Sequence, residues 1–210
     1  MRLEDNYVYR NPISGLKDLT NELKIYLFRH GFSEFNRDGR FTGWQDPPLT
    51  SEGIDQAQRI AEMLQDKAFQ VAYHTRLRRS IDTLTEILKF HNNVQVIEDN
   101  RIMERSYGIL EGRTHQSVID EVGKAQFDIW HRSYDVPPPG GESIQMVEKR
   151  VLEFIEDLLN KMKTDQVSIA ISAHGNSMRP FRRYFEGLSI EEMMKLENPW
   201  DHYFEYTIPP

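Results

Sequence analysis

Residues 25–31 of the chain, Ile-Tyr-Leu-Phe-Arg-His-Gly, carry an apolar run directly into an arginine, a histidine and a glycine. Four apolar residues in succession predict a buried strand. A similar run at 167–171 is followed by His174 and Gly175. Because open α/β sheets bind their ligands beyond the carboxyl ends of the strands, we expect His30 and His174 to face one crevice.

The rest of the chain alternates between strand-like and helix-like segments. Runs of apolar residues predict strands at 23–28, 69–73, 94–97, 167–171 and 202–208. Apolar residues at helical spacing predict helices at 50–64, 77–90, 143–162, 176–186 and 189–197. This order predicts an α/β fold, a three-layer sandwich in which helices flank a mainly parallel central sheet.

A length of 210 residues suits one well-buried domain. We expect a single catalytic domain at 21–210 and an N-terminal appendage at 1–20. The region around 101–142 is less regular, with two short helical stretches and a proline-rich loop. We interpret it as a cap-like insertion over an edge of the sheet.

The composition excludes several kinds of site. The chain has no cysteine, which rules out disulfides, thiolate nucleophiles and zinc–thiolate centres. Its net charge of −7 argues against binding to nucleic acid or to a membrane surface. No apolar stretch is long enough to span a bilayer, and the N-terminal residues are too polar and acidic for a signal peptide. We therefore expect a cytoplasmic protein in which any anionic ligand meets a local group of cations.

His30 is the candidate nucleophile. A neutral imidazole is a competent attacker near neutral pH, and neighbouring cations disfavour protonation of the ring. Arg29 and Arg79 are the candidate clamp for phosphoryl oxygens, because a guanidinium fork matches these oxygens and neutralises charge during transfer. Neutral donors are available at Asn36, Thr42 and Gly43.

Glu104 is the candidate general acid/base, since phosphoryl transfer needs a proton at the leaving alkoxide. The adjacent Arg105 leaves a plain ion pair open as the alternative. His174 either donates a hydrogen bond to the phosphoryl oxygens or orders the site through Asn176.

Other chemistries lack their motifs in this sequence. It has no His-Glu-x-x-His and no aspartate cluster, so we expect no metal. It also has no Gly-x-Ser-x-Gly elbow and no Walker loop. Serine-hydrolase and nucleotide-driven mechanisms are therefore disfavoured.

Five segments resemble the signatures of the cofactor-dependent phosphoglycerate mutases, which belong to the histidine phosphatase superfamily. The Arg-His-Gly motif alone would indicate only the superfamily, whereas the stretch at 129–143 is far more specific to the mutases. The segments are LFRHGFSEFN at 27–36, FTGWQDPPLTSEG at 41–53, RIMERSYGILEG at 101–112, IWHRSYDVPPPGGES at 129–143 and AHGNSMR at 173–179. The resemblance spans about residues 24–188.

The resemblance implies an enzyme of glycolysis and gluconeogenesis that interconverts 2-phosphoglycerate and 3-phosphoglycerate through a phosphohistidine. In this family 2,3-bisphosphoglycerate primes the histidine, and no metal takes part. His30 would be the phosphorylated residue and Glu104 the proton donor. Contacts to the phosphoryl group are implied for Arg29, Asn36, Arg79 and His174. The implied substrate pocket consists of Thr42, Gly43, Tyr107, His115, His131, Arg132, Gly175 and Asn176.

The chain departs from the mutase pattern at positions that hold substrate. His115 stands where mutases usually have a lysine, and His131 replaces the first of two arginines. At these two positions the mutases have permanently charged side chains, whereas this chain has histidines, which can be neutral at pH 7. Ser106 stands where a histidine is common. Mutases also extend a tail over the site, and we expect no such lid after Pro210.

The sequence is compatible with three functions. The leading one is a phosphoglycerate mutase, or a close relative acting on a small phosphorylated acid. The alternative is a histidine phosphatase, in which water removes the phosphoryl group from the same histidine. A non-catalytic binding protein on this fold is disfavoured, because such a protein needs no proton donor. The family is often oligomeric, which leaves a homo-oligomer open.

Overall fold

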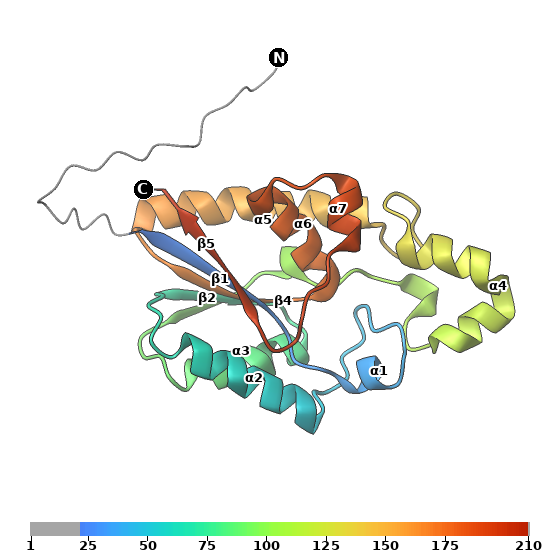
Figure 1. Cartoon of the computed structure of the whole chain (residues 1–210), viewed down its shortest axis with the longest axis horizontal. Coiled ribbons are helices and arrows are strands. Elements are labelled where there is room, and N and C mark those ends of the chain that lie inside the picture. The colour runs from blue at the N-terminus through green and yellow to red at the C-terminus, as the bar shows by residue number, and fades with distance from the viewer. Residues whose placement is uncertain (1–21, 210) are drawn as a thin grey trace, which may run out of the picture.

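The computed structural model describes residues 22–209. The expected appendage at 1–20 lies outside these residues. The described part is an α/β fold whose central sheet is covered by helices on both faces (Figure 1). None of the helices in residues 22–209 is both long and apolar enough to cross a membrane.

Five strands form the sheet in the order β3-β2-β4-β1-β5. The strands β1, β2, β3 and β4 run parallel to their neighbours, and β5 runs antiparallel to β1 along one edge. Their bounds are β1 Leu23–Arg29, β2 Val71–His74, β3 Gln95–Glu98, β4 Ile169–Ala173 and β5 Tyr203–Ile208. The mainly parallel sheet predicted from the sequence is confirmed, with boundaries within two residues of the prediction.

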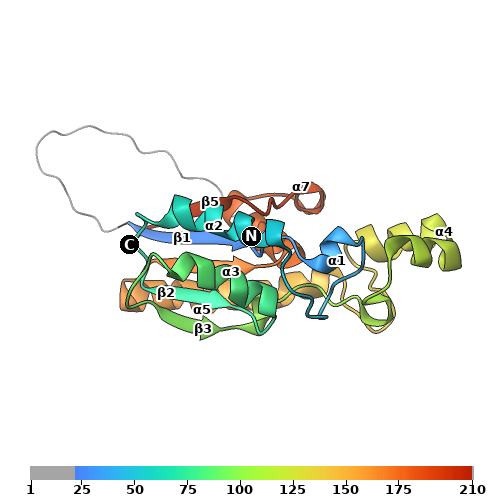
Figure 2. The ribbon, with the colours of Figure 1, turned by 90° about the horizontal axis from the view of Figure 1, so that it is seen from below.

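Alternating side chains of the strands fill two separate cores, as the period of two in a strand requires. Ile25 and Leu27 of β1 face α5 (Ile144–Asp165) and α6 (Gly175–Glu186). Tyr26 and Phe28 face the opposite side, against α2 (Ser51–Leu64) and α3 (Arg78–Leu88). Figure 2 shows α2 and α3 on one face of the sheet and α5 on the other. β1 is therefore buried on both faces, which explains its continuous apolar sequence.

The register of β1 against β4 sets the position of the two histidines. Arg29 pairs with Ala173, the last residues of the two strands. The backbone N–H of His30 then donates to the carbonyl of Ala173 at 3.0 Å. His30 and His174 therefore leave the sheet side by side, and their ring centroids lie 5.0 Å apart.

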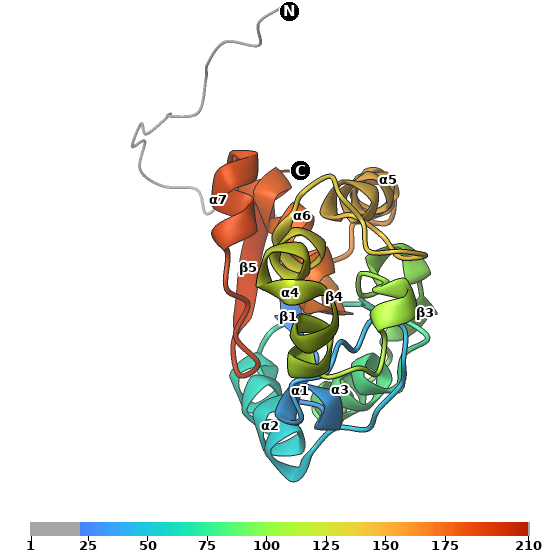
Figure 3. The same ribbon diagram turned by 90° about the vertical axis from the view of Figure 1, so that its right-hand side faces the viewer.

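Beyond the carboxyl ends of these strands lie α1 (Glu34–Arg37) and α4 (His115–Arg132), at the end of the molecule that faces the viewer in Figure 3. Two helical pieces make up α4, and they meet at Gly123, whose φ of 81° is left-handed. A third core, around Phe41, Tyr107 and Phe127, joins this region to the loops after β1. The remaining helices are the short 3-10 turns η1 (Asn100–Ile102) and η2 (Gly108–Leu110), and α7 (Ile190–Lys195).

Candidate active site

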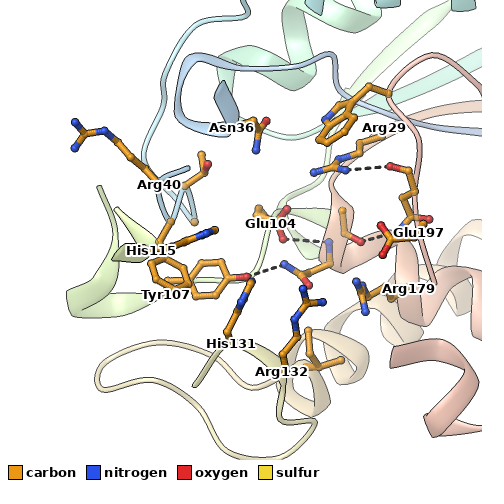
Figure 4. Close-up of a pocket in the computed structure, with 18 of the residues that line it drawn as sticks. Arg29, Asn36, Arg40, Glu104, Tyr107, His115, His131, Arg132, Arg179 and Glu197 are labelled. Carbon is orange, nitrogen blue, oxygen red and sulfur yellow. Dashed lines mark hydrogen bonds between the residues drawn. The ribbon is translucent and has the colours of Figure 1, made fainter. Parts of the chain in front are cut away.

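A cavity of about 340 Å³ opens beyond the carboxyl ends of β1 and β4 (Figure 4). The predicted residues that line it are Arg29, Asn36, Thr42, Gly43, Glu104, Tyr107, His115, His131, Arg132, Gly175 and Asn176. The predicted residues His30, Arg79 and His174 do not line it and are buried. Glu104 connects the two groups, because one of its carboxylate oxygens and one ring nitrogen of each of His30 and His174 lie within 4.8 Å of one another.

The ring of His30 is arranged with one nitrogen free of a proton. Its Nδ1 lies 2.8 Å from the carbonyl oxygen of Gly31, so Nδ1 carries the proton and donates it there. Burial, with the charges of Arg79 and Arg29, lowers the pKa of His30 well below its ordinary value. The ring is therefore neutral at pH 7, and Nε2 keeps its lone pair.

Gly31 allows this loop to approach helix α2 closely. A Cβ atom at Gly31 would overlap the carbonyl oxygen of Gly53, and one at Gly53 would overlap the carbonyl oxygen of Phe32. Gly31 N–H also donates to Thr83 Oγ1 of α3 at 3.0 Å. The loop that carries His30 is thus fixed by backbone packing on both sides.

Arg79 faces the proton-free nitrogen of His30. Its Nε donates to His30 Nε2 at 3.3 Å, while Nη1 and Nη2 donate to the carbonyls of Gln45 and Gly43 at 2.8 Å each. Burial lowers the pKa of Arg79 to about 10, so the group stays charged at pH 7. The two carbonyls therefore hold a buried cation directly against the candidate nucleophile.

Arg29 is held from the opposite side of the site. Its Nη1 donates to the carbonyl of Asn198 at 3.0 Å, and its guanidinium lies 4.1 Å from the ring centroid of Trp200. Its Nε is buried and has no hydrogen-bond partner among residues 22–209. Burial lowers the pKa of Arg29 to about 10. An orphan donor on a buried cation is suited to an anionic ligand.

His174 presents a second orphan donor. Its Nε2 lies 2.8 Å from Thr75 Oγ1, and that hydroxyl accepts from the backbone N–H of Leu77 at 3.4 Å. We assign the hydroxyl proton to the contact with Nε2, because the hydroxyl then both accepts and donates; this assignment leaves the ring proton on Nδ1. Nδ1 is buried and unpartnered within the described chain. Thr75 was not identified from the sequence, because its role depends on this contact.

Glu104 is held by backbone donors and not by an ion pair. Its Oε1 accepts from the backbone N–H groups of Arg105 at 2.7 Å and Asn176 at 3.2 Å. The guanidinium of Arg105 instead donates to the carbonyls of Glu142, Trp130 and His131. The ion pair between Glu104 and Arg105, which the sequence left open as an alternative, is therefore not formed. The side chain is 7 % exposed, at the boundary between the cavity and the buried histidines.

The cluster of His30, Glu104 and His174 has the residue types of a metal site. Arg79 donates to one of its nitrogens, and Arg29 contributes a further charge that lowers the pKa of both histidines. Two guanidinium groups beside the cluster oppose a cation and favour an anion. The electrostatics of this cluster therefore suit a phosphoryl group.

A second layer fixes the mouth of the site. Glu111 Oε1 accepts from the backbone N–H groups of Trp44 and Tyr107 and from the hydroxyl of Ser106, at 3.0 to 3.1 Å. The φ of Gly43 is +49°, and a Cβ there would overlap the same carboxylate. No sequence pattern identifies Glu111, because its role depends on contacts with Trp44, Ser106 and Tyr107 that form only in the folded chain.

The two histidines that stand at positions of mutase cations lie against each other in the cavity wall, with tilted rings. The ring centroids of His115 and His131 lie 5.2 Å apart, and both rings pack against Phe41 and Phe127. Burial, and then the charge of Arg132, lowers the pKa of His131 to about 3 and also lowers the pKa of His115. Both rings are neutral at pH 7.

Several lining residues were not predicted as site residues. Arg179 lies in the segment 173–179 quoted from the sequence, but no role was assigned to it. Trp200 precedes β5 and reaches the site only through the return of the chain to the sheet. The unpredicted lining residues are Phe32, Arg40, Phe41, Ile144, Arg179, Met194, Glu197, Asn198 and Trp200.

Comparison with known proteins supports the resemblance. The chain is 37% identical over 176 residues to a 2,3-bisphosphoglycerate-dependent phosphoglycerate mutase of Parvibaculum lavamentivorans, covering 82% of this chain and 84% of the relative. A protein of the same name from Enterococcus faecalis is 32% identical, covering 84% of this chain and 90% of the relative.

Solved structures with the same fold include phosphatases. An alpha-ribazole phosphatase from Shigella flexneri has a TM-score of 0.72 and 26% identity, covering 81% of this chain and 83% of that one. A mycobacterial glucosyl-3-phosphoglycerate phosphatase has a TM-score of 0.77 at 22% identity, covering 87% and 90%, which shows a shared fold. The family model described as histidine phosphatase superfamily (branch 1) matches residues 25–206. The chain therefore belongs to the histidine phosphatase superfamily.

Proposed function

We propose that the protein is a phosphoglycerate mutase that interconverts 2-phosphoglycerate and 3-phosphoglycerate through a phosphohistidine at His30. The observation that carries this proposal is the state of His30: Nδ1 donates to Gly31, and the free Nε2 faces Arg79 at 3.3 Å. A neutral imidazole with a fixed lone pair beside a cation is suited to attack a phosphoryl group. The curated relatives named as mutases support the choice among phosphohistidine reactions.

In the proposed first half-reaction, Nε2 of His30 attacks phosphorus in line with the ester oxygen. The Nε2–P bond forms as the P–O bond breaks, and the bonding electron pair goes to the leaving oxygen. Glu104 gives that oxygen a proton. Arg29, Arg79 and the Nδ1–H of His174 hold the phosphoryl oxygens, and Asn36 lies nearby on α1. In the second half-reaction, the phosphorylated His30 transfers the group to the free hydroxyl of a monophosphoglycerate: the N–P bond breaks as the new P–O bond forms, and Glu104 accepts the hydroxyl proton. His30 then takes the other phosphoryl group by the first step, so the phosphorylated histidine is regenerated.

The site residues suit the priming donor 2,3-bisphosphoglycerate best at the end beside His30. Arg29, Arg79 and His174 suit one phosphoryl group, and Arg132 lies in the more distant wall of the cavity. The donor, when bound, supplies the phosphoryl group that charges His30. Because His115 and His131 are neutral, the distant wall has fewer cations than the mutase pattern provides.

A direct assay tests this proposal. The protein is incubated with 3-phosphoglycerate, with and without 2,3-bisphosphoglycerate, and phosphorus NMR follows 2-phosphoglycerate and free phosphate together. We expect isomer formation that depends on the bisphosphate, with little phosphate released. An acid-labile phosphohistidine should form in the native protein and be absent in His30→Ala. Absence of phosphohistidine from the native protein would sink the proposal and leave a binding protein.

The second candidate function is a phosphatase that uses the same phosphohistidine. The neutral wall of His115 and His131 favours it, because the loss of two cations weakens the grip on a bisphosphorylated molecule. Release of phosphate from 3-phosphoglycerate without isomerisation would identify this reaction. His30, Glu104, Arg29, Arg79 and His174 would keep the roles given above, with water as the acceptor.

A further inference from the structure

The candidate acid Glu104 lies in a segment that has no helix or strand of its own. Residues 103–107, all within the described part of the chain, connect η1 to η2. The segment is nevertheless buried, and none of its five residues is more than 7 % exposed. Its backbone carbonyls need partners inside the protein, because a buried carbonyl without a hydrogen bond is costly. The position of the Glu104 carboxylate therefore depends on side chains that reach this segment from elsewhere.

Arg150, in the second turn of α5, supplies these partners. Its Nη1 donates to the carbonyls of Arg101 and Met103 at 2.7 and 2.8 Å, and its Nη2 donates to the carbonyl of Glu104 at 3.1 Å. Nε and Nη2 also donate to the two carboxylate oxygens of Glu142, at 2.9 Å each. These contacts match the five N–H donors of a guanidinium, which is planar and rigid. One rigid group thus fixes three carbonyls in and beside the segment that carries Glu104.

Glu142 holds the segment on the other side of Glu104. Its Oε2 accepts from the backbone N–H of Ser106, and its backbone N–H donates to the carbonyl of Ser106, both at 2.9 Å. Its own carbonyl accepts from Nε of Arg105 at 2.6 Å. Glu142 directly precedes Ser143, the N-cap of α5. The backbone before and after Glu104 is therefore tied to the beginning of one helix.

The pair of Arg150 and Glu142 lies outside the cavity lining that the described residues form. An effect on the reaction must therefore pass through the residues that the pair holds. The pair fixes the carbonyl of Glu104 and the N–H of Ser106, and so the backbone between them. That backbone sets the direction of the Glu104 side chain and the position of the Arg105 N–H, which donates to its Oε1 at 2.7 Å.

We infer that Arg150 and Glu142 are positioning residues that keep the carboxyl group of Glu104 where the leaving oxygen of the substrate needs a proton. The inference rests on the proposed phosphohistidine chemistry at His30. A displacement of about 1 Å in a reacting group is sufficient to lower a rate about 100-fold. The bidentate pairing of a guanidinium with a carboxylate gives this support a defined geometry.

Arg150→Lys tests the support without removing the charge. Burial is the main cause of the lowered pKa of His174, and the charge of Arg150 adds to it, so a neutral residue would also alter this histidine. Lysine keeps the charge but offers three N–H donors in the place of five. The folded state of each variant is checked by its urea unfolding curve.

The readout is the rate of phosphohistidine formation from two donors, measured by rapid quenching. The leaving oxygen of 2,3-bisphosphoglycerate needs a proton, whereas that of an aryl phosphate does not. In Arg150→Lys we expect the rate with the bisphosphate to fall about 10- to 100-fold. The rate with the aryl phosphate should change less than about threefold, since no acid takes part. Equal losses with both donors would overturn the inference.

A double-mutant cycle identifies the residue through which Arg150 acts. In a protein that already has Glu104→Gln, adding Arg150→Lys should slow the bisphosphate reaction less than about threefold, because the acid that it positions is absent. Losses that multiply would contradict the assignment. Glu142→Gln should show the same pattern as Arg150→Lys, and it tests the pair from the other side if Arg150→Lys does not fold.

Arg101→Lys is the matched control. Arg101 lies in η1 and also forms an ion pair with a residue of α5, Asp157, but its side chain donates to no backbone carbonyl of residues 103–107 within the described chain. Both phosphorylation rates should therefore stay at the native values in this variant. A selective loss with the bisphosphate in Arg101→Lys would show that any change near this segment has the same effect.

Proton NMR of the backbone amides tests the positioning without activity. The N–H groups of Arg105 and Asn176 both donate to Glu104 Oε1, so their chemical shifts report the place of this carboxylate. Both shifts should move in Arg150→Lys and stay unchanged in Arg101→Lys. If the native protein forms no phosphohistidine and the shifts still move, the proposed function fails and the positioning role stands. Phosphohistidine formation with unmoved shifts in Arg150→Lys would keep the function and overturn the inference.

Discussion

The Nε of Arg79 lies 3.3 Å from the Nε2 of His30, so a buried, permanently charged group touches the one ring nitrogen that has no proton. This contact prevents protonation of the ring in the free protein. It also places the cation where phosphoryl oxygens would lie during transfer. The guanidinium of Arg79 therefore both keeps the ring of His30 unprotonated and stabilises the charge on the phosphoryl oxygens during transfer.

Replacing Arg79 tests both roles. Arg79→Lys keeps a charge but loses the fork that is fixed by the carbonyls of Gly43 and Gln45. We expect the rate of phosphohistidine formation, measured by rapid quenching, to fall by about 10²- to 10³-fold, which is the usual effect of losing one positioned donor. Arg78→Lys is the matched control, because Arg78 is exposed and pairs with Asp82. Equal rates in the two variants would contradict the role given to Arg79.

Glu104→Gln removes the proton but retains an oxygen to accept from the backbone of Arg105 and Asn176. The fold should therefore survive, and turnover of 3-phosphoglycerate should fall by about 10²- to 10⁴-fold. An aryl phosphate has a leaving group that needs no proton, so its rate should change much less. A similar loss with both substrates would show that Glu104 acts through structure and not as an acid.

Thr75→Val removes the hydroxyl that faces His174 Nε2 at 2.8 Å and keeps nearly the same shape. Nitrogen NMR of the native protein should show His174 neutral and protonated at Nδ1, and the variant should show a mixture of tautomers. We expect kcat to fall about tenfold or more with little change in KM, since a charged hydrogen bond is misdirected. Thr75→Ser should restore both readouts. A variant with the native tautomer and reduced kcat would contradict this role.

Buried neutral histidines make stability depend on pH. The pKa values of His30 and His174 are lowered well below 6.5 in the folded protein, and that of His131 is lowered to about 3. The unfolded chain therefore binds more protons than the folded one below about pH 6.5. Their contribution to stability is full above that pH and is lost as the pH falls toward the folded pKa values.

Urea unfolding between pH 7 and pH 5 should show this loss as a falling free energy of unfolding. His131→Phe should reduce the dependence of the free energy of unfolding on pH, because phenylalanine packs on Phe41 and Phe127 without titrating. His202→Phe, at an exposed position, is the control. A slope that is the same in both variants would mean that His131 is accessible to protons in the folded state.

Sequence patterns were sufficient to predict the strands that are covered on both faces and the helices that are covered on one face. β1 is continuously apolar at 25–28 and β4 at 169–171 because both faces are covered there, and α2 and α3 show clear helical spacing because one face of each is exposed. The convergence of His30 and His174 followed from where parallel strands end. These features depend on local pattern and on a general rule of sheet topology.

Other parts of the site depend on contacts between distant segments. Trp200 and Asn198 reach Arg29 only because the chain returns to β1 as an antiparallel edge. Thr75 depends on a contact across 99 residues of sequence. The neutral state of His131 depends on burial among aromatic rings, which no spacing reveals. Such residues carry no periodic signal, so sequence patterns did not identify them.

The contact between His115 and His131 has a consequence for how ligand selectivity can change. Their rings rest on Phe41 and Phe127, and their ring nitrogens make no hydrogen bond to any residue from 22 to 209. Exchanging them for lysine and arginine would place permanent cations among these aromatic rings and beside Arg132, so the change would destabilise the fold in the absence of an anionic ligand. Ligand charge preference and fold stability are thus coupled at this wall, and a variant that gains cations here for polyanionic ligands should lose stability when no ligand is bound.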